Sequence, residues 1–234
     1  MLKTASDGVS ESKRVVGLLL SGGLDSAILL GFLLRRGARV QPFYIDCGLI
    51  WQRAELRALR RFLSAMAESN LLPLVVLSFP LDDVYGQHWS ITGCAIPAAS
   101  TSDQAVFLPC RNVFLVIKAA LWCQLHGIQE LALATLISNP FPDASLRFFE
   151  KFQSALQIAL CQEFRIIRPF GQYHKQQVMD LGRNLPLELT FSCVSPIDGE
   201  HCGACNKCAE RQAAFRIAGM HDLTAYATNS ICVH

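Results

Sequence analysis

The sequence predicts an α/β protein built on a doubly wound parallel sheet, with a small cysteine-rich appendage at the C-terminus. Three observations predict this class: strand and helix patterns alternate, a glycine turn follows the first strand, and four cysteines crowd into one late stretch. Such alternation makes a parallel sheet with helices on both faces. The 234 residues and 51% hydrophobic content suffice for one sizeable core. We expect a flexible terminus at 1–14, the α/β domain at 15–185 and the appendage at 186–234.

Apolar spacing predicts the elements of the first half. Residues 15–20 form a short apolar run typical of a buried strand, and the apolar residues of 25–36 have helical spacing that ends at a glycine. Residues 39–45 alternate as a second strand, and 51–66 carry an apolar helical face. A further apolar run at 74–77 predicts the third strand.

The second half continues the alternation after a polar stretch at 81–109. A connection of that length without a predicted element is typically functional. The patterns that follow predict, in order, a helix at 112–126, a strand at 130–134, a helix at 145–161, a strand at 164–167 and a helix at 175–184.

The glycine turn Ser21-Gly22-Gly23-Leu24-Asp25-Ser26 lies between the first strand and its helix. Ligands of open parallel sheets bind at such turns. The two glycines can expose consecutive N–H groups, Asp25 or Ser26 can cap the helix, and the positive helix end favours an anion such as phosphate. A Gly-Gly pair alone is more often an ordinary tight turn. The full six-residue string favours the phosphate site.

This string resembles the SGGxDS signature of the PP-loop ATP pyrophosphatase family. The resemblance implies an adenine-nucleotide α-hydrolase-like fold, ATP as substrate, and AMP and pyrophosphate as products. Neither the GxxxxGK[ST] nor the GxGxxG motif follows the first strand. By the same resemblance Asp25 would hold the Mg²⁺ that ATP brings. The nucleotide contacts would come from Leu19, Ser21, Gly22, Gly23, Leu24, Asp25 and Ser26.

Two more places at this sheet edge carry candidate contacts. Asp46 ends the second strand, where it can line the nucleotide pocket or cap the strand end, and Cys47 beside it is more often core packing. Arg111 precedes a helix, so its fork of donors can reach a phosphate or a carboxylate. Asn112 can cap that helix or contact a ligand. An arginine at a helix start opposes the helix dipole, which favours a functional role.

The late cysteines have the spacing of a metal site. Cys202, Cys205 and Cys208 follow one another at two-residue gaps, and Cys193 precedes them. Four thiolates suit a closed tetrahedral Zn²⁺ site with a structural role. An iron–sulfur cluster is the chemical alternative, although the fourth cysteine of the ferredoxin run is missing. Ten cysteines without an export signal favour the reducing cytoplasm.

Together with the glycine turn and Pro109–Asn112, the block Thr190–Gly219 resembles the 7-cyano-7-deazaguanine synthases over nearly the full length. The resemblance implies that the carboxylate of 7-carboxy-7-deazaguanine is adenylated, that ammonia displaces AMP to give an amide, and that a second ATP dehydrates the amide to a nitrile. It also matches Lys175 to a family lysine that would neutralise leaving-group charge, although a solvated surface lysine fits equally. The candidate catalytic residues are Ser21, Asp25, Arg111 and Lys175.

The loop Leu136–Ala144 departs from the family's typical Asp-Tyr-Ser-Gly-Tyr-Pro-Asp-Cys pattern and keeps only the Pro-Asp step. Phe141 would stack on a flat ring, and Asp143 would accept hydrogen bonds from a guanine-like amidine edge. With Arg111 and Asn112 these are the candidate substrate contacts. The altered loop leaves the exact substrate and the amine acceptor open.

Other functions stay open beside this one. A related ligase would join a deazaguanine-like carboxylate to another amine or to a protein, and a PP-loop tRNA-modifying sulfur transferase would use a thiol such as Cys110 as carrier. A zinc-stabilised nucleotide-binding module without catalysis is the non-enzymatic alternative. A net charge of +2 argues against direct nucleic-acid binding, and no apolar run reaches the roughly 18 residues of a membrane span. A homodimer also stays open.

Overall fold

The computed structural model describes residues 14–227, so the expected flexible terminus at 1–14 lies outside the described residues except for Arg14. Five parallel strands form one sheet in the order β3-β2-β1-β4-β5. This arrangement confirms the predicted fold class. The strands are β1 (Val15–Leu19), β2 (Arg39–Asp46), β3 (Val75–Ser78), β4 (Glu130–Ala132) and β5 (Arg165–Ile167).

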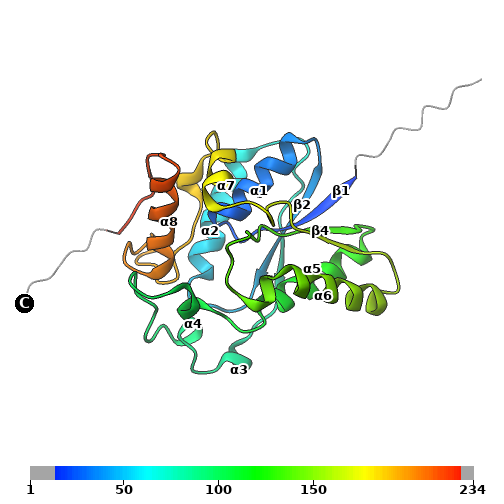
Figure 1. Ribbon diagram of the computed structural model, residues 1–234, viewed down its shortest axis with the longest axis horizontal. Helices are drawn as coiled ribbons and strands as arrows, with labels where there is room; N and C mark the ends of the chain where they lie inside the picture. The colour runs from blue at the N-terminus through cyan, green and yellow to red at the C-terminus, as the bar shows by residue number, and fades with distance from the viewer. Residues whose placement is uncertain (1–13, 228–234) are drawn as a thin grey trace, which may run out of the picture.

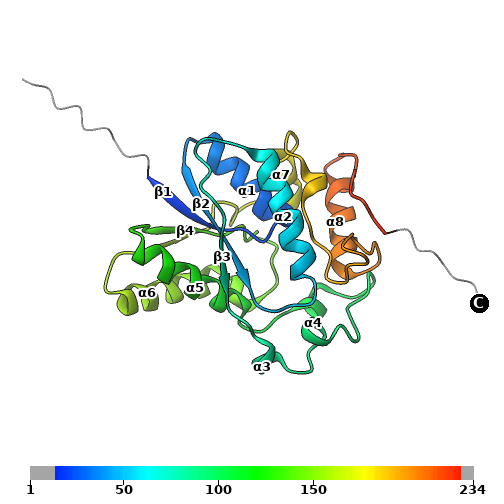
Figure 2. The same cartoon turned by 180° about the vertical axis from the view of Figure 1, so that it is seen from behind.

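Helices cover both faces of the sheet. Two views of the molecule show α5 and α6 on one face and α1, α2 and α7 on the other (Figures 1 and 2). The helices are α1 (Leu24–Arg35), α2 (Gln52–Met66), α3 (Asp82–Tyr85), α4 (Trp89–Thr92), α5 (Arg111–Leu125), α6 (Leu146–Leu160), α7 (Lys175–Leu181) and α8 (Asn206–Ile217). Short 3₁₀ turns lie at Asp103–Val106, Pro142–Ala144 and Leu187–Leu189.

The predicted elements lie within one or two residues of the observed ones, with three exceptions. The helix predicted to reach 184 ends at Leu181, three residues early, before Gly182. The polar stretch at 81–109 contains the single-turn helices α3 and α4, which are too short to show an apolar period. Helix α8 was not predicted, because its buried positions include Asn206 and Arg211 as well as apolar residues.

The sheet separates two apolar cores. The core under α5 and α6 includes Phe43 and Leu131, and the core under α1, α2 and α7 includes Tyr44 and Leu18. Successive residues of a strand point to opposite faces, which is why neighbours such as Phe43 and Tyr44 fall in different cores.

Within the described residues, the C-terminal region has no separate core. Phe215 on α8 packs in the same cluster as Leu18, and the four late cysteines belong to the cluster of Phe43. A segment of this size buries too little apolar surface to fold alone. Figures 1 and 2 place α8 beyond the carboxyl end of β1, the edge where the chain reverses its winding direction between β1 and β4. Ligands of doubly wound sheets bind in the crevice at that point.

Candidate active site

A cavity of about 310 Å³ lies at this edge of the sheet. Its walls come from the glycine turn, from the start of α2, from the start of α5, from the residues after β4 and from the C-terminal region. The polar residues that line it are Ser21, Asp25, Ser26, Tyr44, Gln52, Glu55, Arg111, Asn112, Thr135, Asn139, Lys175, Ser192, Lys207, Glu210 and Arg211. Segments from the whole length of the chain therefore meet in one place.

The glycine turn presents an uncapped helix start to the cavity. Gly22 has φ +86°, a conformation that strains any L side chain, and a Cβ there would lie only 3.1 Å from Cβ of Leu59. Gly23 is the N-cap of α1, and no side chain caps the helix. The expectation that Asp25 or Ser26 caps it is wrong, since Ser26 Oγ donates to the Gly23 carbonyl at 3.1 Å. The free N–H groups suit an anion.

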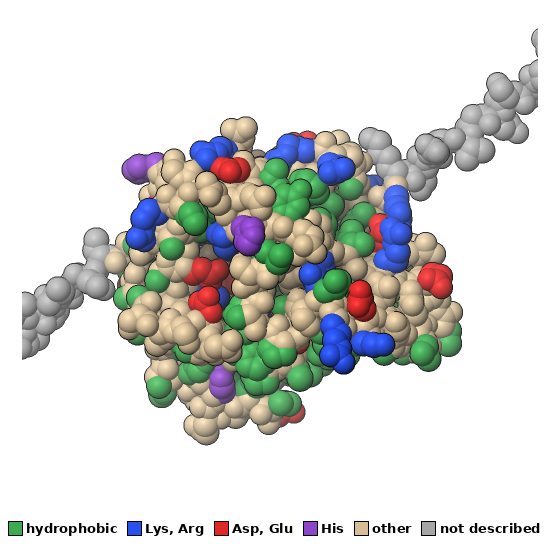
Figure 3. Space-filling view, in the orientation of Figure 1, with side chains coloured by type: hydrophobic (Ala, Val, Ile, Leu, Met, Phe, Trp, Pro, Cys, Tyr) green, Lys and Arg blue, Asp and Glu red, His purple; other side chains and the backbone are tan. Residues whose placement is uncertain are grey.

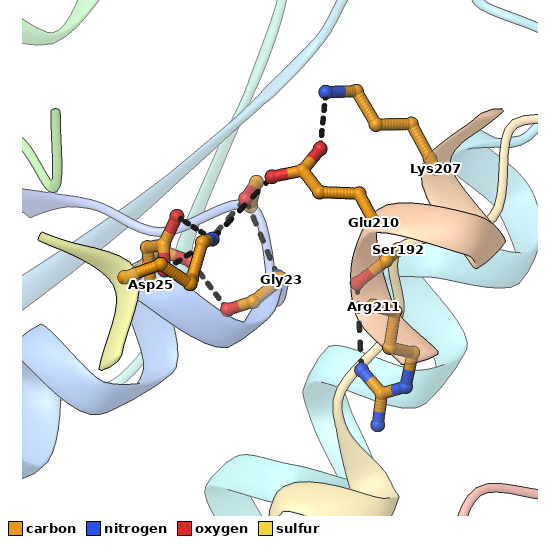
Figure 4. A network of polar contacts seen from close by, with 9 residues as sticks. Gly23, Asp25, Ser192, Lys207, Glu210 and Arg211 are labelled. Carbon is orange, nitrogen blue, oxygen red and sulfur yellow. Dashed lines mark hydrogen bonds and ion pairs between the residues drawn. The ribbon is translucent and has the colours of Figure 1, made fainter. Parts of the chain in front are cut away.

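A charge network connects the glycine turn to the C-terminal helix. Lys175 Nζ lies 2.8 Å from both oxygens of Asp25 and 3.4 Å from Glu210 Oε1, while Lys207 Nζ lies 2.6 Å from Glu210 Oε2. Figure 4 shows Glu210 extending from α8 toward the glycine turn, with the Lys207 side chain directed to Glu210. Burial opposes the charge of Lys175, but Asp25 and Glu210 outweigh it and raise the pKa of the ammonium group. Lys175 is therefore a fixed cation beside the glycine turn.

The start of α2 contributes a buried carboxyl group to the cavity wall. Glu55 is 6% exposed, and the Tyr44 hydroxyl donates to its Oε2 at 2.8 Å. Burial raises the pKa of Glu55 to about 7, against the lowering effect of Arg111. Sequence reasoning missed Tyr44 and Glu55. The available signal was two polar residues, Gln52 and Glu55, on the face of α2 that also carries Leu59.

Arg111 and Asn112 line the cavity at the start of α5. Arg111 Nε is buried and has no hydrogen-bond partner in the described part of the chain. The Asn112 backbone N–H donates to Asp143 Oδ2 at 3.0 Å, and Asn112 Nδ2 donates to the Asp143 carbonyl at 3.1 Å. Asp143 thus supplies the negative charge at this helix start that the sequence of α5 lacks.

The other predicted contacts fall in different surroundings. Asp143 and Phe141 are not among the cavity-lining residues: Asp143 is 8% exposed, and the ring of Phe141 lies 5.2 Å from that of Phe107. Asn139 is the member of the altered loop that lines the cavity. Asp46 is also outside the lining, and its Oδ1 accepts from the Gly48 N–H at 3.1 Å.

Leu19 and Leu24 line the cavity together with the serines of the glycine turn. Cys47 is fully buried, and burial raises the pKa of its thiol to about 11. It therefore packs in the core. Cys110 is exposed in a left-handed conformation, φ +61°, just before α5.

The late cysteines form a second candidate site. The sulfur atoms of Cys193, Cys202, Cys205 and Cys208 are all buried and lie within 4.8 Å of one another. The distances are 3.8 Å from Cys193 to Cys205 and 3.9 Å from Cys202 to Cys208. Tetrahedral zinc–sulfur bonds of about 2.3 Å separate the sulfurs by about 3.8 Å. The cluster could therefore bind a single metal ion.

Hydrogen bonds support the cysteine cluster and attach it to the domain. Backbone N–H groups of Ser195 and Cys202 both donate to Cys193 Sγ at 3.3 Å. Arg211 is 1% exposed and donates to Thr224 Oγ1, Thr190 Oγ1 and the Leu187 carbonyl at 2.7 to 2.8 Å. The Phe191 N–H donates to the Gly22 carbonyl at 2.8 Å, so the segment leading to the cysteines touches the glycine turn.

The chain is similar to known proteins over most of its length. The family model for queuosine biosynthesis protein QueC matches residues 14–219. A 7-cyano-7-deazaguanine synthase of Methanothrix thermoacetophila is 29% identical over 224 residues, which is 89% of this chain and 96% of that protein. The 7-cyano-7-deazaguanine synthase 1 of Desulfitobacterium hafniense is 29% identical over 88% of this chain and 93% of its own length.

The fold is shared with a solved structure of lower sequence similarity. The U34-tRNA thiolase NcsA from Methanococcus maripaludis, solved with its [4Fe-4S] cluster, superposes with a TM-score of 0.52 and 13% identity over 92% of this chain and 73% of that one. This likeness shows the PP-loop fold that the glycine turn predicts. In residues 14–227, no helix is long and apolar enough to cross a membrane.

Proposed function

The chain belongs to the QueC family of queuosine biosynthesis proteins, and from that premise we propose that it converts 7-carboxy-7-deazaguanine to 7-cyano-7-deazaguanine with ATP and ammonia, releasing AMP. The synthase names of its relatives indicate an enzyme. The observation that carries the proposal is the single cavity where Asp25, Lys175 and Arg111 meet beside an uncapped helix start. Formation of an acyl adenylate needs the negative charge of the ATP phosphates to be held and stabilised. The cationic side chains and the free N–H groups at this cavity can do so.

The first step joins the substrate carboxylate to the α-phosphorus of ATP and expels pyrophosphate. We propose that the glycine turn, Ser21 to Ser26, binds the pyrophosphate part with its backbone N–H groups and hydroxyls, with Leu19 as a further nucleotide contact. Lys175 would neutralise charge on the departing pyrophosphate. Asp25 would hold the Mg²⁺ bound with ATP, which supplies additional charge neutralisation.

The second and third steps make the nitrile. Ammonia attacks the acyl adenylate, so the carbon–oxygen bond to AMP breaks and an amide forms. A second ATP activates the amide oxygen, which leaves with AMP as two protons are lost from nitrogen. Arg111 and Asn112 would orient the carboxylate and then the amide oxygen, because they lie at the cavity end of α5 and Arg111 Nε has no hydrogen-bond partner among the described residues.

We propose Zn²⁺ in the cysteine cluster, with a structural role. The donor set is four thiolates at separations suited to one ion, and a four-thiolate site has no open position for water. A four-iron cluster lies between its ligands and would hold them farther apart than one ion does. The thiolate ligands suit the reducing cytoplasm in which we propose the protein works.

A related ligase is the second candidate, and the altered loop Leu136–Ala144 favours it. Of that loop, Asn139 is what reaches the cavity, so the amine acceptor could differ from ammonia and could be a small amine or a protein. A tRNA substrate is less favoured: on the face of the described residues in Figure 3, basic side chains are spread among acidic and hydrophobic ones rather than gathered in a patch.

The test is a product analysis with the purified protein. We would incubate it with ATP, Mg²⁺, ammonium and 7-carboxy-7-deazaguanine and follow products by mass spectrometry. The expected products are AMP, pyrophosphate and the nitrile. Accumulation of the amide without nitrile would show that the reaction stops at the amide and would overturn the nitrile-forming step. Formation of ADP, or no turnover of the acid, would overturn the proposal, and AMP formation only with another amine would select the ligase.

A further inference from the structure

Three carboxylates line the cavity, and one of them forms no ion pair within the described part of the chain. Asp25 pairs with Lys175, and Glu210 pairs with Lys175 and Lys207. Glu55 forms no ion pair with any residue in 14–227, although it is 6% exposed. A buried carboxyl without a cation is unfavourable to folding and is typical of a functional site.

One oxygen of Glu55 is free to bind a ligand. Its Oε2 accepts from the Tyr44 hydroxyl at 2.8 Å, which fixes the orientation of the carboxyl group. Within the described residues Oε1 accepts no hydrogen bond, and it is not closed off from the cavity that Glu55 lines. The neighbouring Gln52 is fully used: its Oε1 accepts from the Cys47 and Leu49 N–H groups, and its Nε2 donates to the Ile45 carbonyl.

The wall around Glu55 suits a flat ring. Trp51 and Phe191 are 3% and 2% exposed and line the same cavity, so they supply apolar surface beside the carboxyl group. Burial raises the pKa of Glu55, and the positive charge of Arg111 offsets part of that rise although the two side chains form no ion pair in the described residues. A ligand with an anionic end and a hydrogen-bond donor end could contact both.

We propose that Glu55 recognises the heterocycle of the substrate by accepting hydrogen bonds from the adjacent ring N–H and 2-amino groups of a 2-aminopyrimidin-4-one. The inference rests on the proposed function, and it assigns to Glu55 the role that the sequence suggested for Asp143. Asp143 lies outside the cavity lining and accepts from the Asn112 N–H. Glu55 would therefore determine selectivity for the amino group.

The chemistry gives a sharp discrimination. A carboxylate offers two acceptor oxygens, which match two adjacent donors. In the described residues Oε1 accepts no hydrogen bond, and Oε2 has a second lone pair beside the one that accepts from Tyr44. A glutamine amide offers one acceptor and one donor, which match a ring N–H beside a carbonyl. Glu55→Gln should therefore disfavour the 2-amino substrate and favour its 2-oxo analogue, 7-carboxy-7-deazaxanthine.

The experiment compares kcat/KM for AMP formation from the two acids at saturating ATP. We expect the wild type to prefer the 2-amino acid by roughly 100-fold or more and Glu55→Gln to lower that ratio by at least about 30-fold, with the KM for ATP unchanged. Glu150→Gln, an exposed change on α6, is the matched control. Tyr44→Phe keeps the carboxylate, so it should lower activity on both acids and preserve the preference.

The result that overturns the inference differs from the result that overturns the proposed function. A Glu55→Gln protein with the wild-type ratio overturns the role of Glu55 and leaves the proposed function standing. A wild type that uses neither acid overturns the proposed function and this inference with it. If Glu55→Gln does not fold, Glu55→Asp tests the inference instead. Withdrawing the carboxylate by one methylene should reduce kcat/KM for the 2-amino acid at least about 10-fold. A wild-type kcat/KM in this variant would refute the inference.

Discussion

Lys175 Nζ lies 2.8 Å from each carboxylate oxygen of Asp25, although 150 residues separate the two in the chain. The contact joins the start of α7 to the glycine turn before α1. Glu210 on α8 approaches the same ammonium group at 3.4 Å. Helix α8, which carries Cys208 of the cysteine cluster, therefore also contributes a charged side chain to the cavity.

Replacing Asp25 by Asn should reduce AMP formation by roughly 100-fold or more, about 2.7 kcal/mol, because the amide cannot hold Mg²⁺ or fix Lys175 by charge. The measurement is the initial rate of AMP release at saturating ATP. Asp180→Asn is the matched control, since Asp180 pairs with Arg183 on the surface of α7. Equal rates for the two variants would contradict a role for Asp25.

Replacing Glu210 by Gln should move the alkaline limb of the pH–rate profile to lower pH. Glu210 raises the pKa of Lys175, so its neutral replacement makes the ammonium group lose its proton at a lower pH. The readout is kcat/KM across the alkaline range. Lys207→Met serves as control, because it removes a partner of Glu210 and leaves Glu210 and Asp25 beside Lys175. A profile unchanged in Glu210→Gln contradicts the network.

Replacing Cys205 by Ser should abolish stoichiometric zinc and leave a less soluble protein, because three thiolates remain around a buried position. Elemental analysis of the purified wild type should give one zinc per chain. Cys161→Ser, at an exposed cysteine, should keep the metal. A brown protein with iron and labile sulfide would reverse the zinc assignment.

Replacing Asp143 by Ala should destabilise the protein by about 1 kcal/mol, because the start of α5 loses its carboxylate acceptor. Activity should fall as well, since the segment carrying Arg111 is anchored there. Denaturant unfolding and the KM values for ATP and for the acid are the measurements. A raised KM for the acid with unchanged stability would restore Asp143 to the substrate site.

Replacing Glu55 by Gln should remove a pH dependence of stability. The pKa of Glu55 rises from 4.5 to about 7 in the fold, so the native state binds more protons than the unfolded chain between these values. Stability therefore falls as pH rises through this window, as Glu55 ionises facing Tyr44, Arg111 and Asp46. The Tm of the wild type relative to Glu55→Gln should decrease from pH 4.5 to pH 8. A constant difference would show that Glu55 titrates normally.

The sequence predicted the glycine turn, the strand and helix alternation and the cysteine cluster because each depends on residues close together in the chain. Ser21 to Ser26 form one turn, and three of the four cysteines lie within seven residues. Hydrophobic period and turn chemistry act over the same range. Local patterns therefore determined the fold class and the sheet edge at which the candidate site lies.

Only the tertiary structure decided which side chains share the cavity. Glu55 was not singled out from the sequence, and the fold buries it in the cavity wall with its carboxyl group accepting from the Tyr44 hydroxyl. Asp143 looked like a substrate contact, and the packing of its loop against α5 directs it to the Asn112 N–H. Burial, pairing and pKa depend on neighbours that are distant in the chain, because desolvation and Coulomb energy are set by distances in space.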